Sequence, residues 1–62
     1  MKQIILNKID FNIIKSIKID LNKILEITVK RGTTNVILKS NEKIIVIETP
    51  LDILKKIINN QN

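Results

Sequence analysis

The strongest constraint on the fold of this chain is a change in the spacing of its apolar residues at Thr49 and Pro50. Before that point, residues 43–48 read Lys-Ile-Ile-Val-Ile-Glu, a β-branched run without helical periodicity that is typical of a strand. After it, apolar side chains recur every three or four positions across residues 50–59, a spacing typical of a short amphipathic helix. The sequence therefore predicts a strand that leads directly into a C-terminal helix.

The start of the predicted helix carries its own signals. Thr49 suits the N-cap, Pro50 suits the first helical position, and Asp52 stands three residues after the cap, as in a capping box. We expect one face of this helix to close the protein's own core, because so short a chain has little else to pack. That face is formed by Leu51, Leu54 and Ile58. The alternative is that the same face binds a partner.

Three further strands are predicted from β-branched or alternating apolar segments: residues 2–6, 24–30 and 34–39. Two short turns separate the last three strands, at residues 31–33 and 40–42, and the only glycine of the chain lies in the first of them. Loops of this length join antiparallel neighbours. The predicted fold class is therefore α+β: a small antiparallel β-meander with a C-terminal helix, in a single domain of residues 1–62.

Residues 9–23 fit two interpretations. Their isoleucine content favours a strand, since β-branched side chains suit a pleated sheet. Their apolar residues also fall within one helical arc of about 120°, and with a helix here the fold would be βαβββα. Residues 44–47 are apolar on both faces of their strand, so the second face needs a cover. That cover is either a helix from residues 9–23 or a second copy of the protein, and we expect a homo-oligomer.

The side chains that catalysis and metal binding use most are scarce. The chain has no cysteine and no histidine, its six acidic residues form no close motif, and it has no glycine-rich loop for phosphate. We therefore expect a protein that is not an enzyme and has no catalytic residue, metal site or cofactor. The longest apolar run, residues 44–47, is far shorter than the roughly 20 residues that span a membrane. We expect a cytoplasmic protein without a membrane partner.

The charge of the chain favours anionic partners. Eleven Lys and Arg residues against six acidic ones give a net charge of +5. The candidate nucleic-acid-binding residues are a predicted hairpin tip and a possible basic face: Lys30, Arg31, Lys15, Lys18 and Lys23. They would contact phosphates, and base stacking is limited to Phe11, the only aromatic residue. The alternative is that Lys30 and Arg31 are simply a solvated turn.

Residues 24–57 resemble parts of two known families. Residues 38–57, LKSNEKIIVIETPLDILKKI, are similar in layout to small flagellar proteins of the FlbD type. In that comparison Glu48 and Thr49 fall on the family's Glu-Ser at the junction of strand and helix. Residues 24–57 are also similar to the middle of LytTR-type DNA-binding domains. The elements shared with that family are Ile24, Leu25, Ile27, Glu48, Thr49 and the closing helix.

These resemblances imply a regulatory or accessory role. Together with the basic charge, they favour a small non-enzymatic regulatory protein that binds nucleic acid through a basic surface. The alternative function is a protein-binding module, such as an inhibitor, an antitoxin-like partner or a flagellar-type accessory protein. Such a module would act through a homo- or hetero-oligomeric surface of the sheet or the helix.

Overall fold

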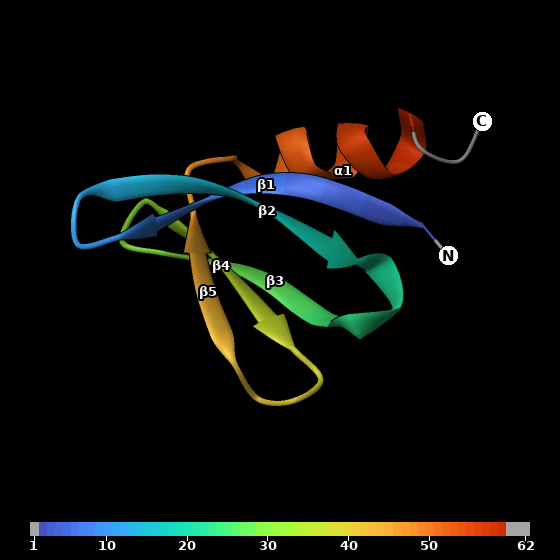
Figure 1. Ribbon diagram of the computed structural model, residues 1–62, viewed down its shortest axis with the longest axis horizontal. Coiled ribbons are helices and arrows are strands. Elements are labelled where there is room, and N and C mark those ends of the chain that lie inside the picture. The colour runs from blue at the N-terminus through green and yellow to red at the C-terminus, as the bar shows by residue number, and fades with distance from the viewer. Residues whose placement is uncertain (1, 60–62) are drawn as a thin grey trace.

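The isoleucine-rich segments of the chain form an antiparallel sheet, as expected of β-branched side chains. The computed structural model describes residues 2–59 (Figure 1). Its strands are β1 (Gln3–Asp10), β2 (Ile13–Asp20), β3 (Ile24–Lys30), β4 (Thr33–Leu38) and β5 (Lys43–Val46). A short 3-10 helix, Leu21–Lys23, links β2 to β3, and α1 (Pro50–Asn59) follows β5. The strand order β2-β1-β5-β4-β3 with antiparallel pairing confirms the predicted small α+β fold.

Residues 9–23 belong largely to a β-hairpin, so the strand interpretation is confirmed and the helical alternative is wrong. β1 and β2 pair in unbroken register and are joined by a two-residue turn, Phe11 and Asn12. The φ angles of these residues are 49° and 68°, as in the type I′ turn whose twist matches a two-residue hairpin. β1 continues beyond the predicted residues 2–6 to Asp10, because this tight turn lets the whole segment pair with β2.

β1 and β5 pair over a short stretch only. Lys8 pairs with Val46, and the Ile47 N–H donates to the Asn7 carbonyl at 3.0 Å, after which the chain leaves the sheet. The β1–β2 hairpin crosses over the ribbon of β3, β4 and β5 (Figure 1). The buried apolar side chains that form the core are Ile4, Leu6, Ile19, Val36, Ile44, Val46 and Ile53.

The apolar run of β5 divides between the core and the outer surface. Ile44 and Val46 are buried, whereas Ile45 and Ile47 are 37% and 49% exposed. Alternation along the strand places the first pair on the inner face of the sheet and the second pair on the outer face. The outer face is the face that a second copy of the protein was expected to cover. An oligomer that covers it stays a prediction.

α1 begins with the predicted capping box. The Thr49 hydroxyl accepts a hydrogen bond from the Asp52 N–H at 3.1 Å, and the Asp52 carboxylate accepts one from the Thr49 N–H at 3.3 Å. These two bonds pair backbone N–H groups that the start of a helix otherwise leaves without partners. The local sequence therefore fixes where α1 starts.

The face of α1 that packs on the sheet differs from the predicted one. Ile53 is fully buried and Ile57 packs against the core, so these two residues anchor the helix. The prediction that Leu51, Leu54 and Ile58 close the core is wrong, because each of them is at least half exposed. The apolar residues of α1 cover a wider arc than its contact with β1 and β3. Their spacing therefore could not identify the buried part of that arc.

A buried carboxylate ties the end of β5 to β1 and β2. The Asn7 N–H donates to both carboxylate oxygens of Glu48 at 3.0 Å, and Asn7 Nδ2 donates to one of them at 2.8 Å. Ser16 Oγ in turn donates to Asn7 Oδ1 at 2.9 Å. The carboxylate replaces the Ile47 carbonyl that a continued ladder would supply. The chain can therefore turn toward α1 without leaving the Asn7 N–H unpaired.

Candidate nucleic-acid interface

The predicted turn after residue 30 is a two-residue hairpin turn between β3 and β4. Its residues, Arg31 and Gly32, have φ angles of 56° and 76°, and Lys30 pairs with Thr33 on either side of them. Gly32 suits this left-handed backbone because it has no Cβ, although the space beside it is open. Arg31 adopts the left-handed conformation with a long side chain. The turn therefore holds Lys30 and Arg31 at the tip of a regular hairpin.

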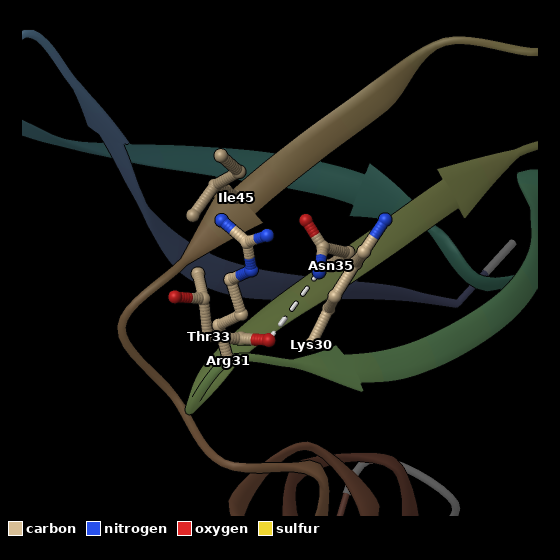
Figure 2. Close-up of a pocket in the computed structure, with 5 residues that line it drawn as sticks. All are labelled: Lys30, Arg31, Thr33, Asn35 and Ile45. Carbon is tan, nitrogen blue, oxygen red and sulfur yellow. Dashed lines mark hydrogen bonds between the residues drawn. The ribbon is translucent and has the colours of Figure 1, made fainter.

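Lys30 and Arg31 border an open hollow on the outer face of the sheet (Figure 2). We call it the Arg31 hollow; it has a volume of about 320 Å³ and is lined by Lys30, Arg31, Thr33, Asn35 and Ile45. The Arg31 side chain lies back over the sheet toward Ile45. Asn35 is buried below it and donates through Nδ2 to the Thr33 carbonyl at 3.3 Å. The hollow therefore places two cations beside uncharged polar groups and one apolar side chain.

Among residues 2–59, no acidic side chain lies within ion-pair distance of Lys30 or Arg31. In the part of the chain that the structure describes, the one ion pair joins Lys23 Nζ to Asp20 Oδ2 at 3.6 Å. Cations that hold no carboxylate can contact phosphate oxygens without first losing an internal partner. The hairpin tip is therefore suited to an anionic backbone.

The other three predicted residues lie away from this tip, although Lys18, opposite Ile5, is on the outer face of the sheet with the Arg31 hollow. Lys15 and Lys18 lie on opposite faces of β2, because side chains alternate along a strand and these two are three positions apart. Lys23 lies in the 3-10 helix and pairs with Asp20. The seven residues of β3 separate Lys23 from Lys30 by roughly 23 Å at strand geometry. Of the five predicted residues, the structure brings together Lys30 and Arg31 only.

Lys8 is a basic residue that the sequence pattern did not single out. The register of the β1–β2 hairpin places it directly opposite Lys15, on the same face of the hairpin. This pairing depends on the two-residue turn at Phe11 and Asn12. A sequence-based search could have found the pair only by identifying that turn, because the register decides which lysines meet.

No protein-family model, curated protein or solved structure matches the chain. The resemblance to FlbD-type and LytTR-type proteins stays a prediction. Residues 2–59 hold no group of three acidic, histidine or cysteine side chains that could bind a metal ion. Across the same residues, no helix combines the length and the apolar character needed to cross a membrane. The functional argument therefore rests on the charge and geometry of the hairpins.

Proposed function

We propose that this chain is a small regulatory protein that binds nucleic acid and catalyses no reaction. One observation carries the proposal: Lys30 and Arg31 stand at a hairpin tip, above the Arg31 hollow, without an acidic partner among residues 2–59. Two adjacent cations without an acidic partner do not contribute to the stability of so small a fold. A phosphate backbone would supply the missing negative charge.

The two cations would act differently on a bound strand. The Arg31 guanidinium presents five N–H donors in one plane and can hold a phosphate or a base edge with two bonds, whereas the Lys30 ammonium acts as a mobile point charge. Thr33 and Asn35 lie beside them with uncharged polar groups, and Ile45 offers an apolar contact for a sugar or base. A single arginine supports at most one two-bonded base contact per chain, so sequence preference would be weak.

The proposal predicts a modest dependence on salt. Each neutralised phosphate on a single strand contributes about −0.7 to the slope of log K against log salt concentration. Lys30 and Arg31, together with Lys8 and Lys15 on the other hairpin, would give a slope of roughly −3. Such a slope weakens binding roughly 50-fold between about 50 and 200 mM salt.

The test is a fluorescence-polarisation titration of single-stranded and duplex DNA and RNA, between about 50 and 200 mM salt. The double variant Lys30→Gln, Arg31→Gln should bind more weakly, and the magnitude of its salt slope should be smaller by roughly 1.4. The matched control, Lys55→Gln with Lys56→Gln on α1, removes the same charge and should keep the slope. Absence of salt-dependent binding by the unmodified protein at micromolar concentration would refute the proposal.

The exposed face of α1 favours a protein-binding module as the second candidate. Leu51, Leu54 and Ile58 form an apolar row on a surface helix, and such rows often mark protein interfaces. Sedimentation analysis would detect a second copy bound there. A dimer that Leu54→Asp converts to a folded monomer supports self-association through α1. A monomer at every concentration excludes it.

A further inference from the structure

Both two-residue hairpin turns carry a bulky residue at their first position. Asn12 and Gly32 occupy the second positions and are residues that type I′ turns prefer. Phe11 and Arg31 occupy the first positions, with φ angles of 49° and 56°, where Asn, Asp or Gly would fit with less strain. They are the only phenylalanine and the only arginine of the chain. The two residues whose side chains carry flat, delocalised groups best suited to stacking therefore occupy the two turns.

Burial does not explain why phenylalanine stands at position 11. Its side chain is 93% exposed and lies outside the core. Ile13 and Ile14, the first residues of β2, are also more than half exposed and point to opposite faces of the hairpin. We call these three residues the Phe11 tip. It is apolar on both faces, so a flat surface could cover only part of it.

A pair of like charges stands directly behind the Phe11 tip. Lys8 and Lys15 face each other across β1 and β2, an arrangement that destabilises an isolated hairpin. Asp10 lies two positions beyond Lys8 on the same face, yet neither lysine lies within ion-pair distance of a carboxylate among residues 2–59. An anion bound beside the tip would relieve the repulsion between the two ammonium groups.

We propose that the Phe11 tip is a base-stacking site for single-stranded nucleic acid. The Phe11 ring stacks on an unpaired base, Lys8 and Lys15 contact the phosphates on either side, and Ile13 and Ile14 pack against the sugars. An unpaired base suits a single ring because it offers its face without the cost of opening a duplex. This inference rests on the proposed function and adds a second contact point to it.

The two hairpin tips can serve one strand. Both turns lie toward the same end of the long axis of the molecule (Figure 1). A strand held by its phosphates at Lys30 and Arg31 could reach the Phe11 tip along that end. Stacking on an aromatic ring tolerates any base, since every base has a π-face. The expected ligand is therefore a flexible single strand with little sequence requirement.

A spectroscopic test uses the absence of tryptophan from the chain. Phe11→Trp places the only indole at the tip, and stacking on a base should quench its fluorescence when a single-stranded oligonucleotide is added. Leu54→Trp is the matched control, because position 54 is exposed on α1 and lies outside both tips. Equal quenching at the two positions, or none at position 11, would overturn the stacking site.

An affinity test separates stacking from phosphate contact. Phe11→Ala should weaken binding to a single-stranded oligonucleotide roughly 5- to 150-fold, which corresponds to about 1–3 kcal/mol. The same substitution should not alter binding to an abasic strand of equal length, which keeps the phosphates and lacks the bases. The exposure of Phe11 makes loss of folding an implausible cause, and circular dichroism of the variant checks this directly.

The outcomes distinguish the site from the proposed function. Equal affinity of the unmodified protein for base-bearing and abasic strands would overturn stacking and leave phosphate binding intact. Failure to bind either strand would overturn the proposed function, and the stacking site with it. Tighter binding to a fully paired duplex, lost in Phe11→Ala, would overturn the single-strand assignment. Phe11-dependent binding to phosphatidylserine vesicles, without binding to oligonucleotides, would overturn it in favour of a lipid surface.

Discussion

Replacing Glu48 with alanine tests how the end of β5 is held. The substitution removes the acceptor for two donors of Asn7, its backbone N–H and its side-chain Nδ2, in a part-buried site. A buried donor without a partner costs about 1–3 kcal/mol, so Glu48→Ala should lower the free energy of unfolding by about 2–4 kcal/mol once partial access of water is allowed for. A domain of this length has about 3–9 kcal/mol in total. The variant should therefore lose a large fraction of its stability.

Glu48→Gln should cost less than Glu48→Ala. Glutamine keeps one oxygen for the Asn7 N–H, but its amide nitrogen would face Asn7 Nδ2. A flip of the Asn7 amide resolves this conflict, because Ser16 Oγ can accept a hydrogen bond as well as donate one. The remaining loss in the free energy of unfolding is the difference between a charged and a neutral hydrogen-bond acceptor, about 1 kcal/mol.

The assay is urea denaturation followed by far-ultraviolet circular dichroism, since the chain has no tryptophan or tyrosine to report on folding. Protein concentration is held constant, because any self-association would add to the apparent stability. Glu42→Ala, at an exposed position between β4 and β5, is the control and should change stability by less than about 0.5 kcal/mol. Equal effects of Glu48→Ala and Glu42→Ala would refute the structural role of the buried carboxylate. A glutamine variant as unstable as the alanine variant would refute the amide flip.

Three further substitutions test other parts of the structure. Thr49→Ala should lower the free energy of unfolding by about 1 kcal/mol through loss of the cap, and an unchanged urea midpoint would contradict this. Val46→Asp should unfold the domain because it buries a charge, whereas Ile45→Asp on the outer face should keep the circular dichroism spectrum of the fold. The reverse pattern would mean that the faces of β5 are misassigned. Phe11→Asn should stabilise the protein by about 0.5–1 kcal/mol and raise its melting temperature, because asparagine tolerates the left-handed backbone. A lower melting temperature would show that Phe11 contributes to folding.

Elements with local signals were predictable from the sequence. The junction of β5 and α1 follows from Thr49, Pro50 and Asp52, which lie within one turn of each other and bond to each other. The turn at Gly32 follows from the only glycine of the chain. The β1–β2 hairpin was ambiguous because Phe11 and Asn12 are not a recognised turn pair, and because the isoleucines around them fit a helical arc as well as alternation.

Features that depend on distant contacts were not predictable. Glu48 bonds to a residue 41 positions away, and nothing near it in the sequence distinguishes it from a solvated acid. The buried face of α1 depends on how the helix meets β1 and β3. In the candidate site, Lys30 and Arg31 are neighbours in sequence and were found together. The position of Lys8 opposite Lys15 could not be predicted, because it depends on the register of the β1–β2 hairpin, whose turn was not recognised.

The fold separates the residues that stabilise it from those that we propose for binding. The interior is filled by aliphatic side chains and closed by the Glu48 carboxylate, whereas Phe11 and Arg31 lie at turns where smaller residues would fit with less strain. A strained and exposed turn residue does not stabilise the folded state. We therefore attribute the choice of Phe11 and Arg31 at these positions to ligand binding. Stability and affinity should consequently respond in opposite directions to Phe11→Asn. Substitutions at Glu48 should lower stability without changing affinity while the protein stays folded.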